Sequence, residues 1–326
     1  MSTHPAPKTK FTGFKKQTSR WKPLTTLSSG KKKQLWNIKT KEEVIAQLGG
    51  DSVVEHRGGY RVGVATNPSR SCVELTEAGI RSADFPLSIY LQDNTRILNL
   101  NDNELTSIPM GISLLSDALE ELHAVNNVIS KLPDDLSHCS DILRVLDLSH
   151  NAFSSFPAPI LTLKRLERLN LSHNSLSVLP DTVAAQWKEL KYLGLKSNRL
   201  KSLPIEMLSC QTLQQIELGQ NRFQSIPSCL YELGSLSILQ ISHNPLKSID
   251  LNAMPGRWHR SLVECNLQFC HLDNLAPLNH DTFPHLLQLS LFGNPFMLNP
   301  ELGALVRVTG QTAPPVLAYL RRLPPV

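Results

Sequence analysis

The stretch LERLNLSHNSLSVLP at residues 166–180 returns as LKYLGLKSNRLKSLP at residues 190–204. Both copies have leucine at positions 1, 4, 6, 11 and 14, asparagine at position 9 and proline at position 15. The same frame fits residues 143–157 and 213–227. A repeat at this period indicates a solenoid, in which each coil covers the apolar face of its neighbours. The asparagine position recurs at nearly even spacing, at Asn103, Asn127, Asn151, Asn174, Asn198, Asn221, Asn244, Cys270 and Asn294.

Two leucines of each copy, such as Leu169 and Leu171, are separated by one residue. In an extended strand alternate side chains point the same way, so both leucines face inward and the residue between them faces outward. Strands of successive coils then pair in parallel at about 4.8 Å, and ten coils make a curved sheet roughly 45 Å long. We expect each asparagine to bond backbone groups of neighbouring coils, and Cys270 to be its structural substitute.

Two further features complete the repeat. An apolar residue and a proline follow the asparagine turn, as in Ile108-Pro109, and proline suits this exit from a strand because it lacks an N–H donor. A degenerate first coil fits the same frame, with Gly79 expected at its asparagine position and with Val73, Leu75 and Ile80 facing inward.

The pattern resembles the leucine-rich repeat family over about residues 72–310. Its length and its apolar-proline step are similar to the intracellular class that includes scribble, erbin and the Ras-suppressor proteins. The resemblance implies an α/β solenoid of about nine or ten repeats. It would have a curved parallel sheet on the concave face and short helical or 3-10 turns on the convex face. It also implies signalling partners such as small GTPases or phosphatase subunits.

A solenoid needs a cap at each end, and the sequence predicts four segments. Residues 1–39, rich in Lys, Thr, Ser and Pro, are expected to be a disordered basic arm. Residues 40–71 are expected to form an N-terminal cap made of a helix and a hairpin. Residues 72–310 form the solenoid, and residues 311–326 a C-terminal capping helix that starts at a proline pair.

Charge is divided unevenly along the chain. Residues 1–41 carry +11 and no acid, whereas the rest of the chain carries −6. Three interpretations of the arm follow. It is a tether that binds RNA, an acidic protein or a membrane surface, or it is a nuclear or mitochondrial targeting signal. The third interpretation is a solvated tail. The chain has no apolar run of about 18 residues, which argues against a transmembrane helix. Residues 1–41 lack the apolar stretch of a signal peptide, and the cysteines are too scattered for a disulfide framework. We expect a cytoplasmic protein, with mitochondrial or nuclear placement as the alternatives.

No motif of catalysis or cofactor binding is present in the sequence, which predicts a non-enzyme without cofactor or metal. His150 and His173 fall at the same position of adjacent coils, but no third ligand repeats with them. Trp258, in a coil longer than its neighbours, is either a second contact surface or an indole packed beneath a long loop, and we favour the packed indole.

A long concave sheet without a reactive pocket predicts a protein-binding scaffold or adaptor, monomeric outside its complex. The alternative is a structural subunit of a large ribonucleoprotein or mitochondrial complex, whose basic arm contacts RNA. Tyr192 and Phe292 stand out among the outward residues, because exposed aromatics are favoured interface anchors, and we expect Tyr192 and Glu217 to be exposed. The predicted partner-binding residues on the concave face are His123, Asp147, Arg168, Asn170, Tyr192, Lys196, Glu217, Gln240, Gln268 and Phe292.

Overall fold

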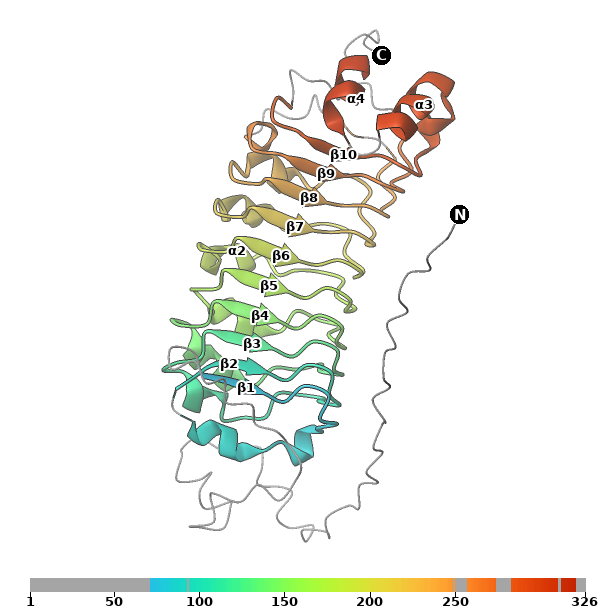
Figure 1. Cartoon of the computed structure of the whole chain (residues 1–326). Helices are drawn as coiled ribbons and strands as arrows, with labels where there is room; N and C mark the ends of the chain where they lie inside the picture. Colours follow the sequence, from blue (N-terminus) through green and yellow to red (C-terminus); the bar gives the residue numbers. More distant parts are fainter. Residues whose placement is uncertain are drawn as a thin grey trace, which may run out of the picture. The chain divides into compact units, whose positions relative to one another are not determined.

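The computed structural model describes residues 71–92, 94–247, 249, 257–273, 283–309 and 312–320. Its described coils stack one upon the next, with their strands side by side (Figure 1). The expected basic arm, residues 1–39, and the expected N-terminal cap, residues 40–71, lie outside the described residues except for Ser71, which begins the first strand. No described helix is long and apolar enough to cross a membrane.

The strands form one parallel sheet of ten, in the order of the sequence, as the repeat predicts. From β2 onward, consecutive strands pair without a register shift. Equivalent residues of each coil therefore stand in rows across the sheet. The strands are β1 (Ser71–Glu74), β2 (Thr95–Asn99), β3 (Glu121–His123), β4 (Val145–Asp147), β5 (Arg168–Asn170), β6 (Tyr192–Gly194), β7 (Gln215–Glu217), β8 (Ile238–Gln240), β9 (Glu264–Asn266) and β10 (Gln288–Ser290).

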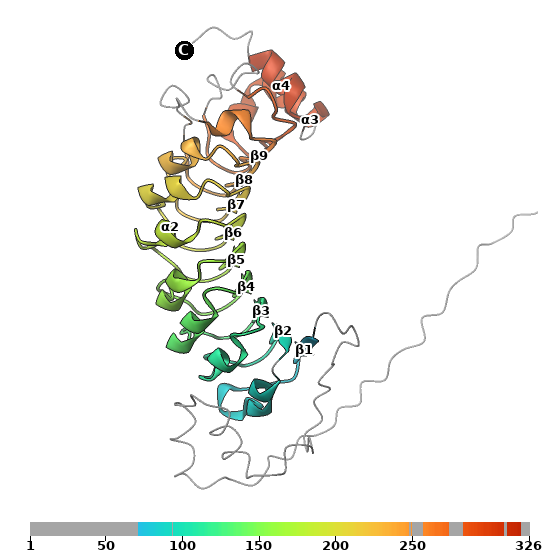
Figure 2. The same cartoon turned by 90° about the vertical axis from the view of Figure 1, so that its left-hand side faces the viewer.

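Short helices return the chain from one strand to the next on the opposite side of each coil. Figure 2 shows the strands lining the concave side of the described coils and these helices on the convex side. The 3-10 helices are η2 (Ser82–Asp84), η3 (Leu87–Leu91), η4 (Ile112–Leu115), η5 (Asp134–Cys139), η6 (Ala158–Thr162), η7 (Ile205–Ser209), η8 (Ser228–Glu232), η9 (Trp258–Arg260) and η10 (Pro295–Leu298). The α-helices are α2 (Val183–Gln186), α3 (Pro300–Thr309) and α4 (Ala313–Leu320).

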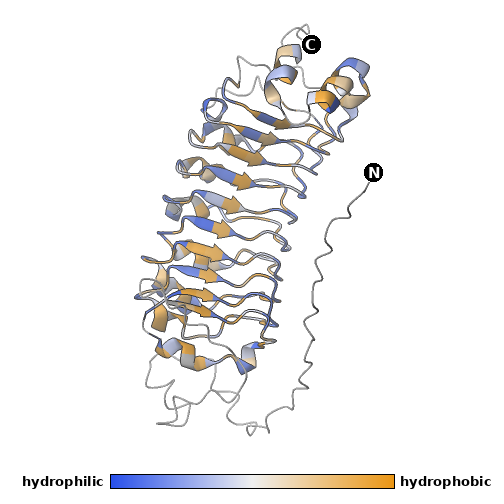
Figure 3. Cartoon of the chain, in the orientation of Figure 1, coloured by the Kyte–Doolittle hydropathy of each residue, from blue (hydrophilic) through white to orange (hydrophobic). Residues whose placement is uncertain are grey.

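The core between strands and helices is mainly aliphatic, because the period-two leucines fill it. Leu169 and Leu171 are fully buried, and their equivalents in the neighbouring coils are buried likewise. Figure 3 shows hydrophobic and hydrophilic residues interleaved within the strands, as expected for a sheet with one buried face. Trp258 is 1% exposed, which confirms the interpretation that its indole is packed within the coil.

The asparagines form a ladder of hydrogen bonds along one edge of the sheet. Asn221 is typical, since its Nδ2 donates to three carbonyl oxygens, those of Leu195, Leu218 and Gly219, at 2.9–3.2 Å. Its Oδ1 accepts from the backbone N–H of Leu200 at 2.9 Å. One side chain thus satisfies backbone groups of its own coil and of the preceding one, as predicted.

Cys270 has the place of an asparagine, and its buried thiol lies 3.4 Å from the carbonyl oxygen of Ile241. It therefore acts as a structural substitute, with fewer bonds than an amide makes. The expected placement of Gly79 at the asparagine position of the first coil is wrong by one residue. The N–H groups of Ala78 and Ile80 both donate to Asn103 Oδ1, so Ala78 occupies that position.

Two α-helices of the described residues, not one, follow β10. α4 buries Val316 and Leu317 against the last coil, within the segment expected to be a capping helix. α3, which packs against η10 and α4, was not expected from the sequence. Gly303 of α3 lies so close to η10 that a Cβ added there would be 2.3 Å from the carbonyl oxygen of Met297.

We expect Gly303→Ala to lower the stability of the protein by about 2 kcal/mol, because the backbone of η10 would have to move. In an ordinary helix the same change would add about 1 kcal/mol of stability. The exposed neighbour Ala304 supplies the control, since Ala304→Gly should cost only the propensity difference. Thermal melts of the two variants check this, and a more stable Gly303→Ala protein would show that α3 does not pack so closely on η10.

Candidate functional site

The predicted site residues all lie on the outward side of the sheet or directly after its strands. Strand register places Asp147 beside Asn170, Asn170 beside Gly194 and Gly194 beside Glu217. The predicted residues that the structure leaves exposed are Arg168, Lys196 and Phe292, and the others are half-buried. Asp147, Arg168, Asn170, Tyr192 and Glu217 come together at the centre of the face, whereas Gln268 and Phe292 lie at its C-terminal end.

Tyr192 contacts both Arg168 and Glu217 in this central cluster. The guanidinium carbon of Arg168 lies 4.3 Å from the centroid of the Tyr192 ring, a cation–π contact. Burial raises the pKa of the Tyr192 phenol, and Glu217 raises it further by its charge and by a hydrogen bond to the hydroxyl. The phenol is therefore neutral at physiological pH and donates a hydrogen bond to the Glu217 carboxylate.

Gly194 makes room for this arrangement on the surface of the sheet. A Cβ at position 194 would lie 2.4 Å from Asn170 Oδ1 and 2.9 Å from the Tyr192 hydroxyl oxygen. Both side chains therefore lean over the bare backbone of Gly194. The expectation that Tyr192 and Glu217 are exposed is wrong, because each is half-buried and tied to the other.

Three carboxylates of the concave face are held by neutral donors. Asp147 accepts from Asn170 Nδ2 at 3.1 Å and from Ser149 Oγ at 2.6 Å. Glu217 accepts from Gln215 Nε2 at 3.0 Å, and Glu264 accepts from the amide of Gln240. Neutral donors fix the orientation of a carboxylate and leave its negative charge in place.

The residues that precede the strands behave differently, and we call them the edge ladder. Arg96, Glu120, Arg144, Glu167 and Lys191 stand in one row of adjacent coils with alternating charge. Arg144 and Lys191 both reach Glu167, at 2.5 and 2.6 Å, and Arg96 reaches Glu120 at 3.5 Å. The hydrogen bond from Lys191 lowers the pKa of the Glu167 carboxyl, and Arg144 contributes in the same direction. Both carboxylates of the edge ladder are thus paired with cations within the chain.

A further row, one residue before each asparagine, has left-handed backbone. Phe269 has φ 53° there, an uncommon conformation for a bulky residue. Its ring occupies the space beside Gly293, where a Cβ would come within 2.4 Å of it. The rings of Phe269 and Phe292 meet edge to face at 5.7 Å and are 39% and 55% exposed. Phe292 is exposed as predicted, whereas the sequence analysis missed Phe269.

In the same row His150 and His173 stack at 3.9 Å, as their equal positions predict. Burial lowers the pKa of His173, and the nearby charges of His150 and Lys196 lower it further. Two imidazoles alone make a poor metal site. Among the described residues no group of three or more His, Cys, Asp or Glu side chains is placed to hold a metal ion.

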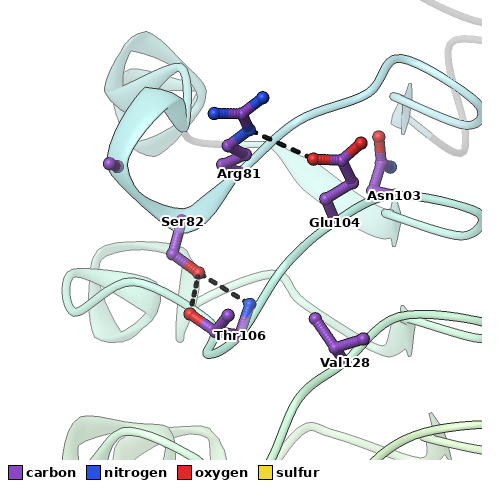
Figure 4. A pocket seen from close by; sticks show the side chains of 7 residues that line it. Arg81, Ser82, Asn103, Glu104, Thr106 and Val128 are labelled. Atoms are coloured by element: carbon purple, nitrogen blue, oxygen red, sulfur yellow. Dashed lines mark hydrogen bonds and ion pairs between the residues drawn. The ribbon is translucent and has the colours of Figure 1, made fainter.

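One hollow of the described residues lies away from the concave centre. It measures about 520 Å³ and is lined by η2 and by turns after β2 and β3. Figure 4 shows the Arg81–Glu104 ion pair and the Ser82–Thr106 hydrogen bonds at its wall. These exposed polar pairs are already satisfied by one another, and the hollow brings together no nucleophile and base.

Comparison with known proteins agrees with this architecture. The family described as "Leucine rich repeat" matches residues 143–200, 164–211 and 188–246. None of the curated proteins matches the sequence.

Several solved structures resemble this one in fold. A leucine-rich repeat protein of Leptospira interrogans is 28% identical, with a TM-score of 0.59, over 64% of this chain and 52% of that chain. The ectodomain of the Arabidopsis thaliana receptor kinase GASSHO1/SCHENGEN3, solved with Casparian strip integrity factor 2, is 26% identical. Its TM-score is 0.55, over 64% of this chain and 26% of that chain.

The Arabidopsis receptor kinase HAESA was solved with the peptide hormone IDA and the co-receptor SERK1. It is 30% identical with a TM-score of 0.50, over 62% of this chain and 34% of that chain. This chain therefore spans about half, or less, of the length of these relatives. Residues 143–246 thus match the leucine-rich repeat family, and the described coils, with their ten-stranded parallel sheet, have the leucine-rich repeat fold.

Proposed function

We propose that the chain is a protein-binding scaffold or adaptor whose concave face accepts a segment of a partner polypeptide. The observation that carries this proposal is the outward-facing row of residues across the ten described strands, most of which are polar and half-buried and which no other described element covers. Leucine-rich repeats generally bind proteins or peptides on such extended surfaces. HAESA, a structural relative, was solved with a peptide hormone and a co-receptor, which supports the proposal by analogy.

We infer three further properties of this scaffold. It performs no catalysis, in keeping with the hydrogen-bonded and ion-paired side chains of the hollow beside η2. It works in the cytoplasm, which its six free thiols favour because disulfides are rare in reducing compartments. Its repeat length resembles that of the scribble, erbin and Ras-suppressor class. Analogy with that class suggests a small GTPase or a phosphatase subunit as the partner.

The second candidate is a ribonucleoprotein subunit, favoured by the +11 charge of residues 1–41. In that case, the protein should sediment in a large particle that shrinks when a lysate is treated with ribonuclease. A species the size of the free chain that ignores ribonuclease excludes this candidate.

Site-specific photo-crosslinking tests the proposed face without disturbing the central cluster. A photoreactive residue at Lys196 or at Gln288, both exposed on the concave side, should give adducts with a partner. The matched controls are Glu206 and Glu232, which are exposed on the convex helices η7 and η8. Adducts from the convex positions alone, or from neither set, contradict the proposal.

A further inference from the structure

Three carboxylates of the concave face have no cation partner, although the face also carries Arg168 and Lys196. Asp147, Glu217 and Glu264 form no ion pair with any described lysine or arginine. In the edge ladder, which runs through the coils of β2 to β6, Glu167 pairs with two cations at once. The uncompensated carboxylates are therefore a property of this face and not of a chain that is short of basic residues.

The concave face already carries one guanidinium group, and the contacts of that group show which kind of cation the face can bind. Arg168 lies over the ring of Tyr192, whose hydroxyl bonds to Glu217. A planar guanidinium can stack on an aromatic ring and bond to a carboxylate at once, whereas the compact ammonium of lysine bonds as a point charge. Arginine is thus the cation that this combination of rings and carboxylates fits best.

A second aromatic surface lies at the C-terminal end of the face. Phe269 and Phe292 present exposed rings at a steep angle, with an interplanar angle of 78°. The left-handed backbone of Phe269 belongs to the repeat, because the residue before each asparagine shares it. Its ring is partly exposed and stacks on that of His243 at 4.6 Å. Exposed aromatic rings beside a sheet face are surfaces for stacking.

We propose that the partner segment is extended and carries arginines, and that it crosses the concave face from Asp147 towards Phe292. This inference rests on the proposed function and names the chemistry of its partner. Asp147, Glu217 and Glu264 lie on β4, β7 and β9, so they span five strand spacings, or about 24 Å. An extended chain covers that distance with about seven residues, and a decapeptide also reaches the two phenyl rings.

Fluorescence anisotropy of the full-length chain with labelled decapeptides tests the proposal. The probes are five Arg-Ser repeats, five Lys-Ser repeats, five Gln-Ser repeats and five Glu-Ser repeats. The arginine peptide should bind best, about threefold more tightly than the lysine peptide, and its affinity should fall as salt rises. Glu217→Gln with Glu264→Gln should weaken it about tenfold, while both positions keep an acceptor oxygen.

The control is Glu206→Gln with Glu232→Gln, which changes net charge equally on the convex side and should alter affinity less than twofold. Phe292→Ala should weaken the arginine peptide about threefold. Thermal melts establish that each variant is folded. Equal binding of the arginine and lysine peptides, or equal losses in the two double variants, overturns the arginine proposal.

Other outcomes separate this inference from the proposed function. If the neutral or acidic peptide binds best and the concave variants weaken it, the face binds polypeptides but the arginine chemistry is wrong. If no peptide binds, or if binding ignores every concave variant, the arginine proposal fails. Photo-crosslinking at Lys196 and Gln288 then decides whether the proposed function fails with it.

Discussion

Replacing Asn221 by leucine is expected to lower the free energy of unfolding by about 4 kcal/mol. The amide of Asn221 makes four hydrogen bonds to backbone groups, and the side chain is 7% exposed. A leucine would leave the N–H of Leu200 buried without a partner, which costs about 1–3 kcal/mol. The carbonyl oxygens of Leu195, Leu218 and Gly219 would each keep one other donor, from Asn198, Asn244 and Ser197, so each of these three lost hydrogen bonds costs about 0.5–1.5 kcal/mol. Partial relaxation of the turn keeps the total near the lower end of that sum.

The matched control is Gln224→Leu in the same coil, at an exposed position. It also replaces an amide with an aliphatic side chain, but it should change stability by less than about 0.5 kcal/mol. Urea unfolding followed by circular dichroism measures both variants. Similar midpoints would mean that the asparagine ladder does not carry the stability assigned to it.

The repeat could be predicted almost completely from the sequence, because its signals are local and periodic. Period-two leucines decide which side chains face inward, and the recurring asparagine decides where each coil turns. The first coil shows the limit of this reasoning. It has no asparagine to mark the turn, so the sequence points to Gly79, although the bonds to Asn103 place Ala78 there.

The C-terminal end could be predicted only in part. α3 begins at Pro300, but a single proline does not distinguish a helix start in a chain whose repeats carry prolines at their turns. The position of α3 depends on the close contact of Gly303 with η10, which is a tertiary property. A glycine in the middle of a helix argues against that helix when only propensity is considered.

The site itself was predicted as a set of positions, and its chemistry came from the structure. Strand alternation correctly places Tyr192 on the outward side, but alternation does not say whether a ring stands up or lies flat. Gly194 lets Tyr192 lie on the sheet and bond to Glu217. Phe269 was missed because the position before the asparagine usually holds small or polar residues, such as Ser197 in this chain. Tyr192 and Phe269 each have a glycine as a neighbour in space, and such a contact cannot be read from the sequence.

Replacing Trp258 by alanine is expected to cost about 4 kcal/mol of stability, the usual range for a large buried aromatic. The indole lies 5.3 Å from the ring of Tyr231 on η8 and 5.5 Å from that of Phe283, which it meets edge on. These three rings bridge the lengthened coil, so the cavity left by alanine would loosen the contact between the coils of β8 and β9. A contact-surface role for Trp258 predicts the opposite result, with partner binding lost and the melt unchanged.

Trp258→Phe sharpens the test, because it keeps a ring between Tyr231 and Phe283. No described residue accepts a hydrogen bond from the buried indole N–H, so phenylalanine removes an unpaired donor while it leaves a smaller cavity. We expect Trp258→Phe to cost about 1 kcal/mol, well below the loss for alanine. Calorimetric melts of the two variants measure the difference, and binding of the arginine peptide serves as the second readout. Because Trp258 is buried behind the sheet, both variants should bind that peptide normally at temperatures where they are folded. A folded Trp258→Phe protein that fails to bind would move the contact surface to the convex side.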